Sequence, residues 1–330
     1  MGDELDALTN QLSEGFQVDP NSLGEHPRYA QFKNLAKAAE QQAKRREETL
    51  ERLKNGRFEK LMKLRNLACD DANSDEEEAQ RAEDAENVAQ IFGDAQQRRQ
   101  VPKYADQLML SEWLVDIPET LSTEWTMMMA PQGKRTLVVA AKGFTTAYNK
   151  SGRQVAQFQS KLPGGSSRGK NGSWTILDCI YHDRIYYVLD VLSWNAHEYV
   201  ENPFDLRQFV LKSKLEETPE LGITCSGFRN AFIAVPSCPC SREEMAKLMD
   251  SKPNFRLDGL LFYHNSVCYE PGQSPLVGWL KPWMLPEILN VPIPDMYYKQ
   301  SKGRTTAEYI KIFNDTHKHK SKVASSMEQD

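Results

Sequence analysis

The stretch WTILDCIYHDRIYYVLDVLSW, residues 174–194, decides the fold of this chain. Apolar and β-branched residues dominate Trp174–Tyr181 and Ile185–Trp194, and a short polar segment, residues 182–184, separates the two runs. Two such runs joined by a few polar residues are typical of a β-hairpin. The stretch therefore predicts a pair of long antiparallel strands.

Similar apolar runs recur on both sides of this pair. Glu124–Ala130 and Arg135–Ala141 are rich in β-forming residues, and Pro131–Lys134 between them predicts another hairpin. Leu257–His264 and Leu276–Leu280 have the continuous apolar character of buried strands. Strands therefore dominate this part of the chain.

Two helices are predicted among these strands, at Asp205–Glu217 and Ser241–Asp250, and Ser241 precedes Glu244 with the spacing of a capping box. Because strands dominate and short turns connect them, we expect an α+β fold with largely antiparallel β-sheets and flanking helices. The aromatic-rich texture begins beyond Val101 and ends near Pro294. We therefore place a globular domain at residues 102–294.

The overall composition narrows the class of protein. The chain has 330 residues, and 41 basic against 46 acidic side chains give a formal charge of −5. No run approaches ~20 uninterrupted apolar residues, and the first residues lack the basic flank and apolar run of a signal peptide. Six irregularly spaced cysteines do not suit a disulfide framework, and Cys238-Pro-Cys240 lacks a second pair of zinc ligands. We expect a soluble intracellular protein with no membrane segment, metal or cofactor.

Charge is distributed unevenly along the chain. From His26 to Arg65 there are twelve Lys and Arg against five Glu, a net charge of +7, whereas Cys69 to Asp94 carries one Arg against ten acidic residues, a net charge of −9. Because the acidic block has almost no aromatic or β-branched residues, we expect a disordered linker at residues 69–100. Residues 295–330 turn polar again and are expected to form a disordered tail.

The basic block predicts a long helix over Ala38–Ala68, which contains no Pro and a single Gly. Its apolar stripe of leucines is narrow and is surrounded by Lys and Arg, so the helix has little reason to fold against its own domain. We expect a mobile segment that waits for a partner. A solvated charged helix and direct binding to RNA phosphates are the alternatives that composition leaves open.

Within this block, Arg28-x-x-x-Phe32-Lys33-Asn34 is followed by Lys44-Arg45-Arg46, Leu53-Lys54-x-x-Arg57 and Lys63-Leu64-Arg65-Asn66. This order resembles the importin-β-binding segment at the start of nuclear import adaptors. In that family an extended lead-in and one basic helix are enclosed by the acidic inner surface of importin-β, and a disordered basic segment that orders in an acidic groove gains steering and charge-assisted contacts. The resemblance places an importin-β-binding segment at residues 26–67. It implies contacts from Arg28, Lys33, Lys44, Arg45, Arg46, Arg52, Lys54, Arg57, Lys63 and Arg65.

A short apolar motif precedes the basic block, within residues 1–20. Its members are spaced as on a helical turn that passes into extended chain: Leu5, Leu8, Leu12, Phe16 and Val18. This spacing resembles a leucine-rich nuclear export signal and implies a nuclear exportin as a partner; a fraying amphipathic helix has the same pattern. Next to an import segment, it predicts a protein that shuttles between cytoplasm and nucleus.

The globular domain carries an ordered series of motifs: Gly133-x-Arg135, Ile176-Leu177-Asp178, Tyr187-Val188-Leu189-Asp190, Asp258-Gly259-Leu260-Leu261-Phe262 and Trp279-Leu280-Lys281-Pro282. The series resembles that of covalent nucleotidyltransferases such as messenger RNA capping enzymes. Those enzymes need a lysine amine that attacks the α-phosphate. Aligned on Gly133 and Arg135, this chain has Ala130 at the position of that lysine. The resemblance therefore implies a nucleotide-binding fold without the nucleophile.

Other departures agree with the loss of catalysis. Cys179 and Ile180 replace the Gly-Glu that helps those enzymes hold a metal, and Trp279 replaces a lysine of their phosphate clamp. We expect no enzymatic activity. An active guanylyltransferase-like enzyme and a general RNA-binding protein with a basic helix are the alternatives from other classes.

Four longer strings of the globular domain are Tyr104-Ala-Asp-Gln-Leu-Met-Leu-Ser-Glu-Trp-Leu114, Leu162-Pro-Gly-Gly165, Asp258-Gly-Leu-Leu-Phe-Tyr-His264 and Pro275-Leu-Val-Gly-Trp-Leu-Lys-Pro282. With these strings and the basic segment, the chain resembles the snurportin family, whose members recognise the 2,2,7-trimethylguanosine cap of spliceosomal small nuclear RNA and import the ribonucleoprotein. This resemblance implies trimethylguanosine-capped RNA, importin-β, an exportin and the core proteins of the ribonucleoprotein (snRNP) as partners.

The resemblance also implies the residues of a cap site. Trp279 corresponds to the tryptophan that stacks on the cationic methylated guanine, and Trp113 to a second tryptophan near the N2 methyl groups. Ser111 and the backbone of Ala130, which stands where the family has cysteine, would line the base. Arg135 and Lys150 would face the triphosphate.

Each of these residues has an ordinary structural alternative. Tryptophan is usually largely buried, so Trp113 and Trp279 would otherwise be core residues. Arg135 and Lys150 would be surface charges. The aspartates of the motif series, Asp178, Asp190 and Asp258, are expected to be structural hydrogen-bond partners and not catalytic acids.

Overall fold

The computed structural model describes residues 35–69, 102–167, 172–225, 227–301 and 303–314, with side chains of the long basic helix described for residues 39–56. The predicted export motif, Arg28, Lys33 and residues 70–100 of the linker predicted at 69–100 lie outside the described residues, as do the side chains of Arg57, Lys63 and Arg65. Cys69, the first residue of that predicted linker, is helical. Within the described part, no helix has the length and apolar character needed to cross a membrane.

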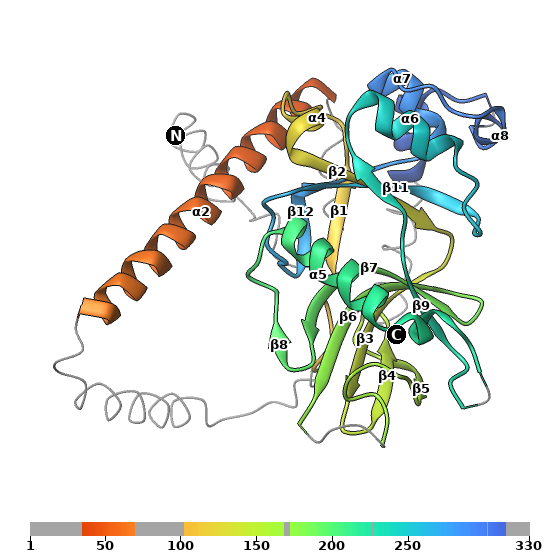
Figure 1. Cartoon of the computed structure of the whole chain (residues 1–330). Helices are drawn as coiled ribbons and strands as arrows, with labels where there is room; N and C mark the ends of the chain where they lie inside the picture. Colours follow the sequence, from red (N-terminus) through yellow and green to blue (C-terminus); the bar gives the residue numbers. More distant parts are fainter. Residues whose placement is uncertain (1–34, 70–101, 168–171, 226, 302, 315–330) are drawn as a thin grey trace, which may run out of the picture.

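Two β-sheets form the body of the domain (Figure 1). The five-stranded sheet has the order β1-β12-β11-β2-β10, with β1 at Met109–Trp113, β12 at Gly272–Leu280, β11 at Leu257–His264, β2 at Trp125–Pro131 and β10 at Ser237–Pro239. Its pairs are antiparallel except for β1 and β12, which run parallel.

The seven-stranded sheet has the order β5-β4-β3-β6-β7-β8, and β9 also pairs with β7. Its strands are β3 at Lys134–Ala141, β4 at Phe144–Tyr148, β5 at Gln154–Phe158, β6 at Trp174–His182, β7 at Ile185–Trp194, β8 at His197–Glu198 and β9 at Ala231–Ala234. Only β7 and β9 pair in parallel. The predicted α+β class with largely antiparallel sheets is confirmed.

Helices flank both sheets. They are α2 at Leu35–Cys69, α4 at Leu121–Glu124, α5 at Phe204–Glu217, α6 at Arg242–Asp250, α7 at Leu285–Leu289 and α8 at Asp295–Tyr298, with short 3₁₀ turns η2 at Pro219–Gly222 and η3 at Pro282–Met284. The helices predicted over 205–217 and 241–250 are confirmed as α5 and α6, and the Ser241 side chain accepts the N–H of Glu244 as an N-cap.

The hairpin predicted from residues 174–194 is confirmed as the β6–β7 pair. Asp183 and Arg184 connect the strands with φ values of 44° and 64°. Positive φ at both central residues is the geometry of a two-residue hairpin turn that matches the twist of the strands. This pair forms the centre of the seven-stranded sheet.

The hairpin predicted for residues 124–141 is wrong. Both strands form, but β2 pairs with β10 and β11 in one sheet, whereas β3 pairs with β4 and β6 in the other. The intervening chain is held by distant partners: the N–H of Gln132 donates to the Arg256 carbonyl at 2.8 Å, and a Cβ on Gly133 would collide with the Tyr181 backbone. The segment therefore crosses between sheets.

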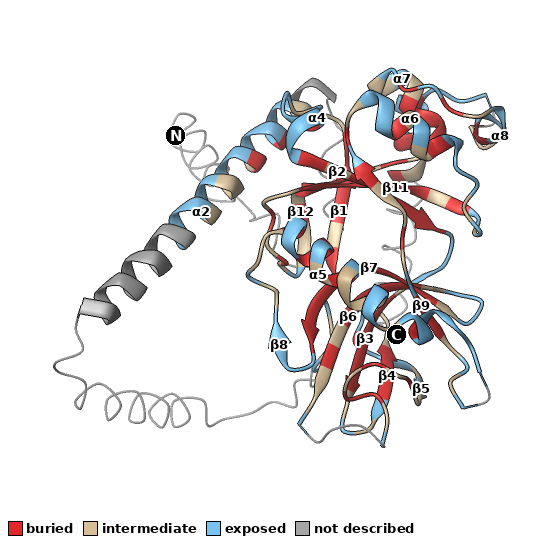
Figure 2. Cartoon of the chain, viewed as in Figure 1, coloured by how far each residue is buried: buried red, intermediate tan, exposed pale blue. Residues whose placement is uncertain are grey.

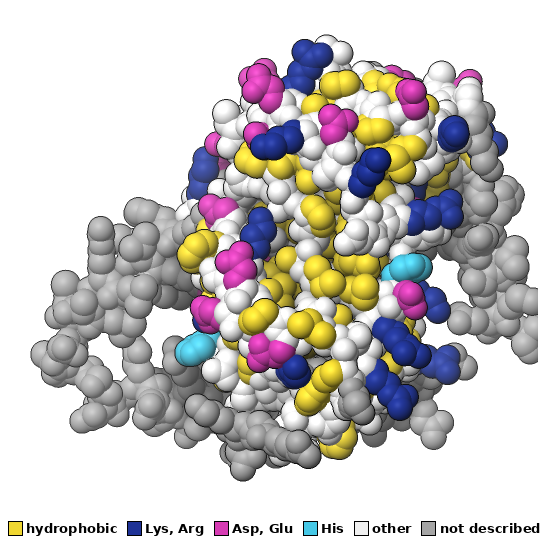
Figure 3. Space-filling model, turned by 45° about the vertical axis from the view of Figure 1, so that its right-hand side comes forward, with side chains coloured by type: hydrophobic (Ala, Val, Ile, Leu, Met, Phe, Trp, Pro, Cys, Tyr) yellow, Lys and Arg dark blue, Asp and Glu magenta, His cyan; other side chains and the backbone are white. Residues whose placement is uncertain are grey.

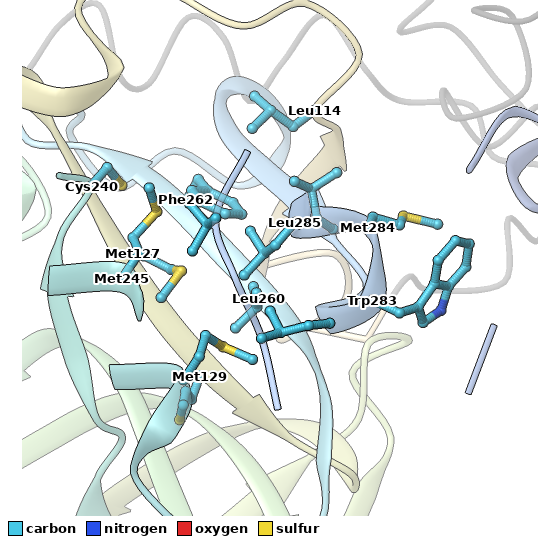
Figure 4. Packing of buried hydrophobic residues seen from close by; sticks show 14 of the residues in the cluster. Leu114, Met127, Met129, Cys240, Met245, Leu260, Phe262, Trp283, Met284 and Leu285 are labelled. Carbon is cyan, nitrogen blue, oxygen red and sulfur yellow. The ribbon is translucent and has the colours of Figure 1, made fainter. Parts of the chain in front are cut away.

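Three apolar clusters stabilise this arrangement, and burial is concentrated in the strands of both sheets (Figure 2). One, the outer cluster, lies between the five-stranded sheet and the helices α6, α7 and η3, where Met127, Met245, Phe262 and Trp283 are buried (Figure 4). A second, the central cluster, joins the two sheets, and a third lies under α5 and η2. Burying the sheet faces is the main driving force for this fold.

The predicted disorder of residues 295–330 is wrong for the part that the structure describes. Residues 306–314 are helical, Tyr297 and Ile310 are only 3% exposed, and the Thr306 hydroxyl donates to Glu287 at 2.5 Å. Because this segment is polar on average, its composition gave no sign that Tyr297 and Ile310 pack in the outer cluster of the five-stranded sheet. Residues 315–330 lie outside the described residues.

The expectation that the basic helix has no reason to contact its own domain is also wrong. The helix itself is confirmed as α2, but Arg45, Arg46 and Arg52 form ion pairs with Glu112, Asp116 and Glu270 of the domain. The narrow leucine stripe predicted no docking on the domain, yet Leu50 and Leu53 pack against an apolar cluster of the domain beside these ion pairs. The contacts bring α2 alongside β12 and the β1 edge of the five-stranded sheet (Figure 1).

A fully buried ion pair links α5 to the seven-stranded sheet. The Arg207 guanidinium donates to both carboxylate oxygens of Asp190 at 2.9 and 2.8 Å, and to the Val267 carbonyl at 2.8 Å. Both side chains are 0% exposed. Removing one partner from such a pair leaves an uncompensated buried charge.

Arg207→Met should therefore lower the free energy of unfolding by about 3–5 kcal/mol, measured by urea denaturation. The exposed Arg153 supplies the control, because Arg153→Met removes a charge without uncovering a buried carboxylate. A loss below about 1 kcal/mol in Arg207→Met, the range of surface pairs, would contradict the assigned role.

Candidate functional site

Trp279 is the partly exposed member of the predicted tryptophan pair. It lies on β12, in register with Leu261 of β11 and Trp113 of β1, and it packs against the outer and the central apolar clusters. Its ring occupies the space above Gly259, where a Cβ would overlap the indole. Glycine in the Asp258-Gly259 motif is therefore a packing requirement of Trp279.

A lysine lies close to the same indole. The Lys281 ammonium nitrogen is 5.4 Å from the ring centroid of Trp279, and it donates to the backbone and side-chain oxygens of Asp258 at 2.8 Å. A cation at this distance is attracted by the quadrupole of the ring. Asp258 thus has the structural role that we expected.

Ala130 lies two strands from Trp279, on the other side of β11. It is on β2, directly opposite Gly259, and it is 1% exposed. Its methyl group belongs to the central cluster between the sheets. No side-chain amine is possible here, so the position can offer only backbone groups to a ligand.

Ser111 and Trp113 lie on β1, at the edge of the same sheet. Ser111 is in register with Ser274 and buried, whereas Trp113 is 1% exposed and packs edge-on against Tyr309 and Phe313 of the helical segment 306–314. The structure thus places Trp113 in the outer core, as its structural alternative predicts. Contact between Trp113 and a ligand stays a prediction.

Arg135 lies on β3 and joins the two sheets. Its guanidinium donates to both carboxylate oxygens of Asp178 at 2.5 and 2.7 Å, and to the Met109 carbonyl of β1 at 3.1 Å. The Tyr269 hydroxyl also donates to Asp178, at 2.8 Å, and accepts the Met109 N–H. Burial, together with the charge of Asp178, raises the pKa of Tyr269 well above its usual value, so the phenol keeps the proton that it donates.

Asp178 is in register with Asp190 on the neighbouring strand, and each aspartate is engaged by an arginine. Burial raises the pKa of Asp190, and the charge of Arg207 opposes that rise. Two carboxylates occupied by bidentate arginines are structural groups, as expected.

Lys150 differs from the other predicted site residues because it lies on a turn and not on a strand. It is exposed on the turn between β4 and β5, and its carbonyl accepts the N–H of Asp106 at 2.9 Å. The structure thus brings Trp279, Ala130, Ser111 and Trp113 onto one sheet, with Arg135 bridging from the other and Lys150 on a turn.

Sequence reasoning missed two residues that organise the site. Gly259 stood in a recognised motif, but its packing against the Trp279 ring on the neighbouring strand β12 became visible only in the folded sheet. Tyr269 carried no local signal, because its partner Asp178 is 91 positions away in the sequence.

Comparison with known proteins identifies the class of this domain. The family model described as "Snurportin1, m3G cap-binding domain" matches residues 107–282, and a model described as "Snurportin1" matches residues 26–66. The matched region is thus of the m3G cap-binding class. Since that region covers more than half of the chain, the chain belongs to the snurportin family.

Solved structures that resemble part of the chain include DNA ligases. The ligase domain from M. tuberculosis LigD has a TM-score of 0.35 and 13% identity over 52% of this chain and 58% of that one. A Chlorella virus DNA ligase–adenylate has a TM-score of 0.34 and 12% identity, covering 53% of this chain and 67% of the other. The chain therefore spans less than two thirds of the length of that ligase domain.

Gly259→Ala should displace the Trp279 ring, because a methyl group there overlaps the indole. We expect a shifted tryptophan emission spectrum and at least tenfold weaker binding of any ligand that stacks on Trp279, about 1.4 kcal/mol. Gly222→Ala is the matched control, since nothing lies within 4 Å of a Cβ at Gly222. Unchanged emission and affinity in Gly259→Ala would show that the ring is not held in place by this contact.

Proposed function

We propose that this chain binds the 2,2,7-trimethylguanosine cap of spliceosomal small nuclear RNA through Trp279 and carries the ribonucleoprotein to importin-β as a nuclear import adaptor. The observation that carries the proposal is the match of residues 107–282 to the m3G cap-binding family, in a domain where Trp279 is partly exposed above Gly259.

The chemistry of the cap suits an indole. Methylation at N7 makes guanine cationic, so stacking on Trp279 combines dispersion with cation–π attraction. Within the domain itself, the Lys281 ammonium nitrogen lies 5.4 Å from the Trp279 ring centroid, so this indole is accessible to a cation. The N2 methyl groups accept no hydrogen bond, and burying them is favourable only against apolar surface, the role that we propose for Trp113.

The phosphates of the cap need positive charge. Asp178 neutralises Arg135, so this arginine would contribute directed donors more than net charge. Lys150 is exposed and would supply net charge by moving toward the triphosphate. Ser111 and the Ala130 backbone would line the base.

We propose that the domain binds without catalysis. The position of the nucleophilic lysine is Ala130, buried and aliphatic, and Lys281 is held by Asp258. Lys134, at the start of β3, and Lys142, on the turn between β3 and β4, are exposed. None of these lysines combines a buried site with a free amine.

The amino-terminal segments complete the proposed adaptor. The match of residues 26–66 to the family supports an importin-β-binding segment there, whose basic charge suits an acidic receptor groove. The apolar motif at 5–18 would recruit an exportin and return the protein to the cytoplasm, which together with import gives shuttling. The core proteins of the ribonucleoprotein are further proposed partners.

Trp279→Ala should weaken binding of a trimethylguanosine-capped dinucleotide by roughly ten- to a hundredfold, because stacking of a base on an aromatic ring contributes ~1 to 3 kcal/mol. Fluorescence quenching of the full chain measures the affinity. Phe209→Ala is the control, since Phe209 is an exposed aromatic, 68% accessible, on α5. Equal affinity of the wild type and Trp279→Ala would exclude this stacking role.

Incubation with radiolabelled GTP and Mg²⁺ should leave the chain unlabelled, because no lysine occupies the position of the nucleophile. A capping enzyme serves as the positive control on the same gel. Label that survives denaturation would show that another lysine has taken over catalysis and would refute the binding-only proposal.

A further inference from the structure

The strand that carries Ser111 and Trp113 is irregular. β1 pairs with β12 in two pieces, since Ser111 is opposite Ser274 and the next residue, Glu112, is opposite Gly278. As an edge strand, β1 has no partner strand on its other side within the described residues. An interrupted edge strand is weakly specified unless something else holds it.

A single glutamine of α2 supplies that support. The Gln42 side chain is 2% exposed, and its amide nitrogen donates to the Glu112 carboxylate at 3.0 Å and to the Trp113 carbonyl at 2.8 Å. Its amide oxygen accepts the N–H groups of Val115 at 3.1 Å and Asp116 at 3.0 Å. The amide therefore hydrogen-bonds the chain at and beyond the end of β1 much as a neighbouring strand would.

Charge reinforces the contact. The Arg45 guanidinium donates to both oxygens of Glu112, which is 1% exposed, and Arg46 donates to the Asp116 carbonyl at 2.7 Å. One step further, the N–H of Leu114 donates to the Trp279 carbonyl at 3.2 Å. A short chain of bonds thus leads from Gln42 through β1 to the proposed stacking residue.

We propose that Gln42 is a positioning residue for cap recognition, so that the docked basic helix is part of the cap-binding unit. Withdrawal of α2 loosens the end of β1 and weakens cap binding; by linkage, the cap in turn favours the docked helix. This inference rests on the proposed cap-binding function.

The test compares full-length Gln42→Ala with Gln41→Ala. Both variants replace a glutamine of α2 with alanine, the best helix former, but Gln41 is exposed whereas Gln42 is buried. Hydrogen exchange at the Val115 and Asp116 amides reports docking, and exchange of β6 and β7 reports whether the domain stays folded. Fluorescence titration with the trimethylguanosine-capped dinucleotide reports cap affinity.

We expect Gln42→Ala to accelerate exchange at Val115 and Asp116 and to weaken cap binding about fivefold or more, the lower end of typical coupling between linked sites, with Gln41→Ala unchanged. Arg45→Ala, which removes both bonds to Glu112, should act in the same direction and serves as a second variant if Gln42→Ala proves unstable.

Faster exchange with cap affinity within twofold of the wild type would overturn the inference, because docking would then be structural only. Unchanged exchange would overturn it as well, since the contact would not support β1 in solution. Failure of the unmutated chain to bind the cap would instead refute the proposed function, so the two failures are distinguishable.

Discussion

The bidentate contact between Arg135 and Asp178 is the interaction on which the rest of the domain depends. It connects β3 and β6, and the same guanidinium bonds Met109 on β1 of the other sheet. Tyr269 completes the bridge from the β11–β12 connection, and Arg207 holds Val267 of that connection to the Asp190 pair. Because buried charges are tolerated only when they are paired and hydrogen-bonded, these contacts permit one relative placement of the two sheets.

The proposed recognition surface follows from this placement. Hydrophobic side chains gather at the waist between the two lobes of the molecule, with Lys and Arg side chains to one side of the lower lobe (Figure 3). Trp279 is partly exposed because Gly259 leaves room for its ring, whereas Trp113, its neighbour in register, is covered by Tyr309 and Phe313. The two tryptophans therefore differ in solvent exposure because different side chains pack around them.

The proposed binding of importin-β and the observed docking on the domain place two requirements on the basic helix. A helix that binds an acidic receptor needs accessible arginines, yet Arg45 and Arg46 of α2 are engaged by carboxylates of the domain. Exposed ion pairs such as Arg52–Glu270 are weak in water, whereas the buried amide of Gln42 is costly to leave without partners. Docking strength is therefore concentrated at the end of α2 that contacts β1.

The sequence alone determined the features that depend on residues close together along the chain. The β6–β7 hairpin, the strands β11 and β12, helices α5 and α6 and the long basic helix all followed from local patterns. Tertiary structure alone decided which sheet β2 and β3 join, how residues 303–314 pack, how α2 docks and which tryptophan stays exposed. These outcomes depend on partners far apart in the chain, such as Gln132 with Arg256 and Gln42 with Trp113. Local propensity cannot encode them, because their free energy arises only when the sheets have already come together.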